Sequence, residues 1–243
     1  MQRRNKSTFF CFSPPVMMAT FLIEIGLALW TLWRYRMSRL VQLSVATFVC
    51  LAVFQLAEYT ICEGLFGLSQ LTWAKIGYVA ITALPALGIH LLSVIAKQKV
   101  PWLLALSYGS MFVFMGYFLF AANGISATTC GGNYVIFKTS NYATSWYTLY
   151  YYGLELLVVA ASIYLARKVS SQRTKQALLG LTAGYLGFMV PVAIANTINP
   201  EFINAVPSVM CGFAVIFALS LGLYVLPRTA HPRQSRIGTS DKT

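Results

Sequence analysis

Acidic residues are scarce in this chain: its 243 residues include six Asp and Glu, and Asp241 is the only aspartate. Charged residues of all kinds make up 10% of the sequence, against about 25% in an ordinary soluble domain. The chain also lacks the motifs GxxxxGK[ST], GxSxG, HExxH and CxxC, which carry phosphate binding, acyl transfer, zinc hydrolysis and thiol chemistry. An intramembrane hydrolase would need paired aspartates or a Ser/His pair. We therefore predict that the protein is not an enzyme and uses no cofactor.

Hydrophobic residues, 58% of the chain, gather in blocks long enough to cross a bilayer, which takes roughly 20 helical residues. We predict an all-α, polytopic membrane protein with lipid as its surroundings. A bundle of seven transmembrane helices would occupy residues 1–226, and a short basic cytoplasmic tail residues 227–243. No small-residue cleavage site follows the first block, so we expect an uncleaved helix there. The predicted spans cover about 13–33, 40–60, 71–96, 101–122, 144–166, 177–197 and 208–226.

The net charge of +12 raises the question of nucleic-acid binding, which the positions of Lys and Arg answer. Most of the 18 basic residues lie in the first, third and fifth connections and in the tail. This bias predicts a cell-membrane protein with those segments and the C-terminus in the cytoplasm, and the N-terminus outside. Arg3, Arg4 and Lys6 at the N-terminus oppose it, but four segments outweigh one. The basic charge is thus interpreted as an orientation signal, and we predict no nucleic-acid partner.

Four residues of the Asp, Glu, Lys and Arg types fall inside the predicted spans. Glu24 and Glu155 lie near the middle of the first and fifth spans, whereas Glu58 and Lys75 lie near the outer ends of the second and third. An ionised group near a helix centre costs at least ~2.5 kcal/mol, so each needs a partner or a role. Because a short outer loop joins their helices, we expect Glu58 and Lys75 to form an ion pair, more readily a structural clamp than a ligand contact.

Helical spacing places further polar residues beside these four. Tyr151 and Glu155 stack one turn apart on the fifth span, while Tyr78 follows Lys75 by three residues on the third. These stripes predict a shared polar cavity that opens outward, although aromatic residues at span ends also form interfacial belts. Asn196, near the end of the sixth span, would join the cavity or cap its helix. The candidate ligand-binding residues are Glu58, Lys75, Tyr78, Tyr151, Glu155 and Asn196.

Prolines lie inside two of the predicted spans. Pro85 in the third and Pro191 in the sixth each free a backbone carbonyl and are predicted to kink their helices. Such kinks either hollow out a pocket or accommodate packing, and the sequence alone favours neither.

Cysteine and histidine give little sign of metal chemistry. His90 stands inside the third span without a His/Cys/Asp cluster at ligand spacing, so we predict a hydrogen-bonded core histidine and no metal. Cys11, Cys62 and Cys130 map to the outer face, where a disulfide such as Cys62–Cys130 is chemically possible. The pairing itself does not follow from sequence.

The order of several of these features resembles the N-terminal seven-transmembrane sensor region of histidine kinases, over residues 29–226. The resemblance lies in Ala57-Glu58, Trp73-Ala74-Lys75, Tyr78, Pro85, the Tyr-rich start of the fifth span, Lys175-Gln176-Ala177-Leu178-Leu179, Pro191, Asn196 and Pro207. The chain departs from the family at Gly77, where Gln is common, and at Asn204-Ala205, where an acidic residue is common. No kinase module follows. The resemblance implies a stand-alone sensor module.

Three functions are therefore considered. The leading hypothesis is a receptor-like seven-helix module that binds an unknown small molecule in its outer half and signals to a separate protein at the cytoplasmic face. The first alternative is a small proton-coupled transporter with Glu24 and Glu155 as proton carriers. The second is a non-catalytic membrane assembly subunit.

Overall fold

Seven helical spans cross the molecule, as the hydropathy pattern predicted. The computed structural model describes residues 14–64, 67–121, 124–125, 127–130, 135–138, 141–198 and 205–233. Within them, seven helical segments have the length and hydropathy to cross a bilayer. The chain is thus a multi-pass, all-α membrane protein. The candidate spans are Pro14–Arg34, Arg39–Glu63, Gln70–Ala96, Pro101–Phe120, Ser145–Lys168, Gln172–Ile198 and Val206–Thr229.

Two spans are built from more than one element. The third consists of α3 and α4, and the last of α8, a π-helical segment and α9. In chain order the elements are α1 (Pro14–Arg34), α2 (Arg39–Glu63), α3 (Gln70–Thr82), α4 (Leu84–Ala96), α5 (Pro101–Phe120), β1 (Ala127–Cys130), β2 (Val135–Lys138), α6 (Asn141–Lys168), α7 (Gln172–Ile198), α8 (Val206–Leu219), the π-helical segment (Ser220–Val225) and α9 (Leu226–Thr229).

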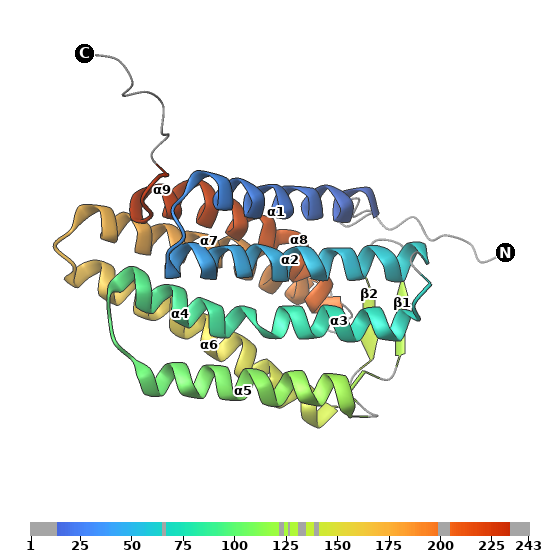
Figure 1. Cartoon of the computed structure of the whole chain (residues 1–243). Helices are drawn as coiled ribbons and strands as arrows, with labels where there is room; N and C mark the ends of the chain where they lie inside the picture. Colours follow the sequence, from blue (N-terminus) through green and yellow to red (C-terminus); the bar gives the residue numbers. More distant parts are fainter. Residues whose placement is uncertain are drawn as a thin grey trace, which may run out of the picture.

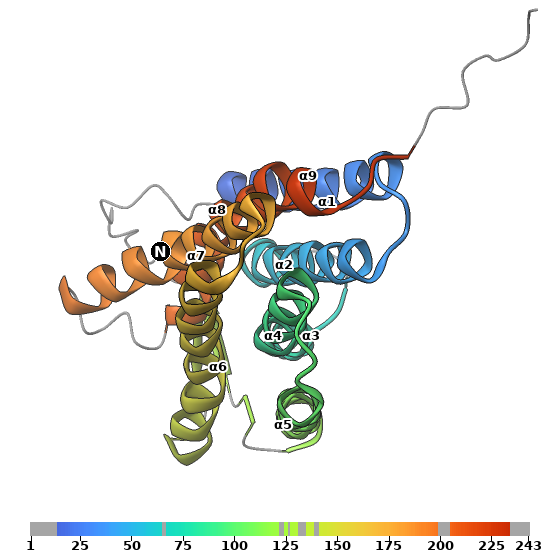
Figure 2. The same ribbon diagram turned by 90° about the vertical axis from the view of Figure 1, so that its left-hand side faces the viewer.

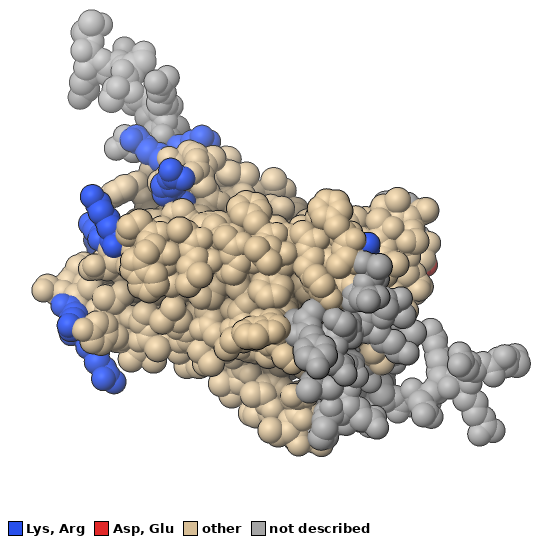
Figure 3. Space-filling model, turned by 90° about the horizontal axis from the view of Figure 1, so that it is seen from below, with Lys and Arg blue, Asp and Glu red and all other residues tan. Residues whose placement is uncertain are grey.

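The spans run side by side and define two ends of the bundle (Figure 1). The strands β1 and β2, with the start of α1, lie at one end, here called the strand end. The opposite end, the basic end, carries the turns rich in Lys and Arg (Figure 3). Along the helix axes, α5 lies at the edge of the bundle, whereas α3 and α4 lie between α2 and α5 (Figure 2). Accordingly, 78% of an apolar 18-residue stretch of the third span is buried, but only 17% of the corresponding stretch of the fourth.

Local sequence explains where the helices begin and end. The Ser38 and Ser69 hydroxyls cap α2 and α3 by accepting hydrogen bonds from the backbone N–H groups of Val41 and Thr72, which satisfies donors that a helix start leaves free. Gly64 ends α2 with φ 71°, a left-handed conformation that glycine adopts without steric cost.

The third span is broken where the sequence predicted a kink. α3 ends at Thr82 and α4 begins at Leu84, with Pro85 in the first turn of α4. Because proline has no N–H to donate, the backbone at Ala83 tightens and its N–H bonds to Ala80 at 3.2 Å. Pro191 does not interrupt its helix, since α7 is continuous from Gln172 to Ile198.

Small residues bring α7 close to the last span. A Cβ atom added to Gly184 would stand 2.9 Å from the Phe217 ring, and one added to Gly187 would stand 2.7 Å from Ile216. Such small-residue faces allow membrane helices to approach closely. Further toward the basic end, the Ser220 hydroxyl donates to the Gly180 carbonyl at 2.8 Å, which ties the start of the π-helical segment to α7.

The polar stretch between α5 and α6 contains structure that the sequence pattern did not predict. β1 and β2 form an antiparallel pair, here called the strand pair, in which Cys130 lies opposite Val135. A disulfide joins Cys130 to Cys62 in the last turn of α2. The possible pairing of Cys62 with Cys130 is therefore present, while Cys11 lies outside the described residues.

Candidate functional site

Three glutamates from three different spans are buried in the bundle. Glu24 of α1 is 0% exposed, and Glu58 of α2 and Glu155 of α6 are each 1% exposed. Within the part of the chain that the structure describes, both carboxyl oxygens of Glu24 lack a hydrogen-bond partner, as do Oε1 of Glu58 and Oε2 of Glu155. Buried polar groups are nearly always satisfied in folded proteins, so this set of unsatisfied oxygens marks a candidate functional site.

Cys211 of α8 lies within electrostatic range of all three acids. Glu24 also interacts with Glu58. The Gln55 amide donates to the Cys211 carbonyl oxygen at 2.8 Å, which fixes α2 against α8. We call Glu24, Glu58, Glu155 and Cys211 the glutamate core.

No basic side chain balances the glutamate core within the described part of the chain. The expected ion pair between Glu58 and Lys75 is not formed, and that prediction was wrong. The Lys75 ammonium instead donates to the Leu119 carbonyl oxygen at 3.0 Å, in the last turn of α5, where exposed carbonyls favour a cation. Glu58 is hydrogen-bonded to the Ser208 hydroxyl. The neutral Ser208 hydroxyl thus bonds to Glu58, where the sequence pattern led us to expect the Lys75 ammonium.

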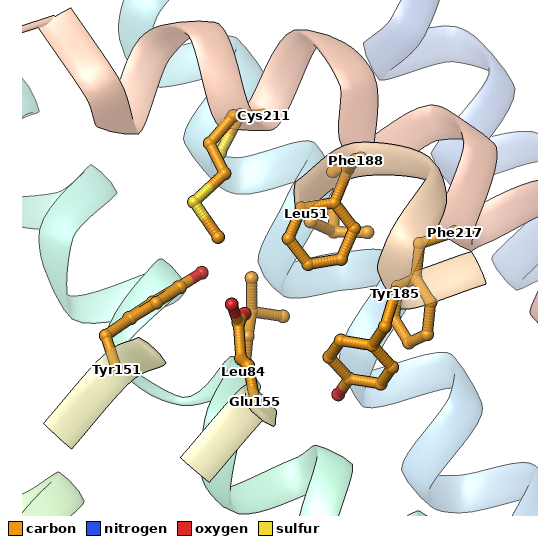
Figure 4. A pocket seen from close by; sticks show the side chains of 10 residues that line it. Leu51, Leu84, Tyr151, Glu155, Tyr185, Phe188, Cys211 and Phe217 are labelled. Atoms are coloured by element: carbon orange, nitrogen blue, oxygen red, sulfur yellow. The ribbon is translucent and has the colours of Figure 1, made fainter. Parts of the chain in front are cut away.

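A small cavity adjoins Glu155 (Figure 4). The Tyr151 hydroxyl and the Glu155 carboxyl point into it, and apolar or sulfur-bearing side chains complete its wall. Its free space holds about one water molecule, far below the roughly 300–1,000 Å³ of a typical small-molecule pocket. The lining residues are Leu51, Leu84, Tyr151, Glu155, Tyr185, Phe188, Met210, Cys211, Ala214 and Phe217.

Tyrosines of α6 hold the broken third span. The Tyr150 hydroxyl donates to the Thr82 carbonyl at 2.7 Å, and the Tyr147 hydroxyl lies 3.1 Å from the Thr82 hydroxyl. Both bonds reach the residue at which α3 ends. Tyr147 is also in ring contact with Tyr151 at 5.7 Å, so the junction and the cavity share one aromatic layer.

Two of the six predicted ligand-binding residues line the cavity found among the described residues. Tyr151 and Glu155 are these two, and Glu58 belongs to the glutamate core. Tyr78 does not line the cavity but lies close enough to Glu58 and Cys211 to interact electrostatically with both. Tyr78 is buried in ring contacts with Phe118, Phe137 and Tyr147. Asn196 is half-buried near the end of α7, and its Oδ1 has no hydrogen-bond partner.

The remaining candidates for metal or catalytic chemistry have ordinary surroundings. The His90 ring lies 2.9 Å from the Tyr108 hydroxyl, as expected for a hydrogen-bonded histidine. Among the described residues, no cluster of three or more His, Cys, Asp or Glu side chains is placed to hold a metal ion.

Sequence reasoning missed the contribution of α8. Ser208 and Cys211 are separated by three residues, and this spacing places them on one helical face. That pattern was available as a signal, but nothing in one sequence indicates that this face meets α2 and α6. Glu24 was recognised as an embedded acid, but its proximity to Glu58 was not.

Comparison with known protein families and with curated proteins finds no match for this sequence. The resemblance to the sensor region of histidine kinases therefore stays a prediction. What the structure establishes is a multi-pass helical bundle that contains the glutamate core.

Proposed function

We propose that the chain is a membrane-embedded, receptor-like module that responds to a small ligand at the glutamate core and signals to a separate protein at the basic end. The observation that carries this proposal is the set of three buried glutamates with free oxygens and, among the described residues, no basic partner. An uncompensated buried charge costs several kcal/mol. An occupant that supplies charge or hydrogen bonds to these oxygens lowers the free energy of whichever bundle conformation admits it.

The size of the cavity limits what this occupant can be. In the conformation described, a water-sized group fits beside Glu155 and a drug-sized molecule does not. In this conformation the site therefore suits a proton. A larger ligand would require the surrounding helices to move apart.

A route for the signal leads from the cavity to the third span. Tyr151 lines the cavity and contacts Tyr147, which is hydrogen-bonded to Thr82 at the α3–α4 junction. A change at Glu155 that moves Tyr151 would act on this junction, where the helix is already interrupted. Since α4 ends at the basic end, its movement would change the surface presented to a partner.

Spin-label distances at the basic end test this proposal. Gln98→Cys and Ser171→Cys place labels after α4 and before α7, in a background with Cys11→Ser and Cys50→Ser and with Cys211 left buried. In nanodiscs, we would compare pH of about 8 with about 5, sodium with potassium chloride, and phosphatidylglycerol with phosphatidylcholine. We expect one of these changes to shift the distance, and Glu58→Gln or Glu155→Gln to abolish the shift.

Glu63→Gln is the matched control, because Glu63 is an exposed glutamate at the end of α2, and it should leave the shift intact. A distance that stays constant under all conditions would refute the sensor proposal. So would a shift that persists in both core variants.

Proton-coupled transport is the second candidate, because Glu24, Glu58 and Glu155 all interact with the same residue, Cys211. Embedded acids of this kind also occur in proton relays. Proteoliposomes with an entrapped pH-sensitive dye would separate the two functions. A transporter carries protons down an imposed gradient and loses this flux in Glu155→Gln, whereas a sensor changes its spin-label distance without flux.

A further inference from the structure

The strand pair packs over the strand end of the glutamate core. Val135 and Phe137 of β2 are buried. The Phe137 ring is centred 5.0 Å from the Tyr78 ring and 6.1 Å from the Phe54 ring. β2 thus inserts an aromatic side chain between α3 and α2, the helix that carries Glu58.

A chain of hydrogen bonds connects the strand pair to the acids. The Val135 N–H donates to the Ser208 hydroxyl at 3.2 Å, and Ser208 is hydrogen-bonded to Glu58. Cys211 lies three residues beyond Ser208 on α8, about one turn deeper in the bundle. The backbone of the strand pair is therefore hydrogen-bonded to Ser208, and Ser208 is hydrogen-bonded to the glutamate core.

The disulfide fastens the strand pair at the same place. Cys62 follows Glu58 by one helical turn on α2, and its partner Cys130 lies opposite Val135 in the strand register. The covalent link and the hydrogen bond to Ser208 thus meet on neighbouring residues. Separating the strand pair from the bundle would require breaking both, together with the Phe137 ring contacts.

We propose that the strand pair is a lid that the Cys62–Cys130 disulfide holds closed over the glutamate core, and that opening it exposes the core to water from the strand end. This inference does not rest on the proposed function, because a sensor and a transporter would each need an entrance. It assigns the entrance to the seam between β2, α2 and the start of α8.

Cys211 is a native reporter of this lid, since its side chain is 4% exposed and lies behind Ser208. In a Cys11→Ser, Cys50→Ser background, it is the free thiol that a membrane-impermeant methanethiosulfonate reagent would modify in nanodiscs. We expect slow labelling with the disulfide intact. Adding Cys62→Ser and Cys130→Ser should raise the labelling rate at least about tenfold, because local opening becomes more frequent.

Phe137→Ala tests the lid with its disulfide in place and should also accelerate labelling. Ile136→Ala is the matched comparison, since Ile136 lies on the opposite face of the strand and is only half-buried, and it should accelerate labelling less than Phe137→Ala. Phe48→Ala, a core truncation in α2 remote from the strand pair, should not accelerate labelling and so controls for loss of stability.

Equal labelling rates in the parent, the disulfide-free variant and Phe137→Ala would overturn the lid. Rapid labelling of the parent, or acceleration by Phe48→Ala as strong as by Phe137→Ala, would overturn it as well. Where the disulfide-free variant does not purify as a folded protein, the comparison of Phe137→Ala with Ile136→Ala decides the question.

Discussion

Glu24 and Gln55 are both buried, but they differ in how their polar atoms are satisfied. Neither carboxyl oxygen of Glu24 has a hydrogen-bond partner, whereas the Gln55 amide donates to the Cys211 carbonyl. Removing a satisfied donor from a buried site costs free energy, while neutralising an unsatisfied acid does not. This difference leads to opposite expectations for two nearly isosteric exchanges.

Glu24→Gln should leave the thermal stability in detergent unchanged or raise it, because no interaction made by the carboxyl group is lost. Gln55→Glu should lower the free energy of unfolding by roughly 1–3 kcal/mol, since an acceptor would then face the Cys211 carbonyl. Thermal unfolding followed with a thiol-independent fluorescent dye measures both. Loss of stability in Glu24→Gln equal to that in Gln55→Glu would show that Glu24 makes a structural contact.

Gly88→Ala is expected to destabilise the bundle, because the added methyl group would overlap the Tyr185 hydroxyl. Overpacking of this kind costs roughly 1–3 kcal/mol, and displacement of Tyr185 would also deform the cavity wall. Gly109→Ala on α5 is the control, since a methyl group added there would meet no atom within 4 Å. The control should be neutral or stabilising by up to about 1 kcal/mol, measured by the same unfolding assay.

The third span behaves as two helices whose junction depends on a neighbouring element. Its carbonyl at Thr82 is satisfied by the Tyr150 hydroxyl of α6. Membrane helices tolerate proline when neighbouring groups satisfy the backbone in this way. The stability of the junction therefore resides partly in α6.

Tyr150→Phe should loosen the α3–α4 junction, because it removes the hydroxyl donor but keeps the ring. We expect a loss of roughly 0.5–1.5 kcal/mol and faster hydrogen exchange of the backbone amides from Ala83 to Leu87, measured by mass spectrometry. Tyr164→Phe, at an exposed position on the same helix, should leave that exchange unchanged. Protection that is identical in both variants would mean that the Tyr150 bond does not hold the junction.

Sequence periodicity predicts the spans well, because each apolar block is a local property of the chain. It does not predict the full break at Pro85, since whether a proline kinks or interrupts a helix depends on partners such as Tyr150. The strand pair also escaped prediction. Its two strands of four residues each carry little pattern, and they are fixed by long-range contacts to Cys62 and Ser208.

The candidate site was predicted only in part for the same physical reason. Helical spacing placed Tyr151 beside Glu155 correctly, because both lie on one helix. The predicted ion pair between Glu58 and Lys75 does not form, because the Lys75 side chain is long enough to reach the end of α5. Ser208 and Cys211 belong to a span distant in sequence, and packing between distant spans is not encoded in the spacing within either one.

The whole bundle has one basic end, and the chain closes upon itself there. The Arg36 N–H donates to the His231 carbonyl and the Arg233 N–H to the Arg34 carbonyl, so the start of the tail pairs with the first connection. The turns that follow α4 and α6 lie at this same end (Figures 1 and 3). Because these segments share one end of the bundle, all of them are expected on the same side of the membrane.

Single cysteines at Gln98, Ser171 and Leu68 should report which end faces the cytoplasm. All three positions are exposed, the first two at the basic end and Leu68 at the other. By the distribution of Lys and Arg, we expect Gln98→Cys and Ser171→Cys to be shielded from an impermeant maleimide added to intact cells and Leu68→Cys to react. Reaction of Gln98→Cys and Ser171→Cys from opposite sides of the membrane would contradict the bundle itself.

The π-helical segment in the last span holds one more residue per turn than an α-helix would. Passing that extra residue along the helix would rotate everything beyond it by about 100°. The Arg228 guanidinium, now stacked 3.4 Å above the centre of the Tyr224 ring and bonded to Gln176 of α7, would swing away from α7. A shift of one residue in this segment, which follows Cys211 in the span, would thus turn the last cationic side chain of the span to a new direction.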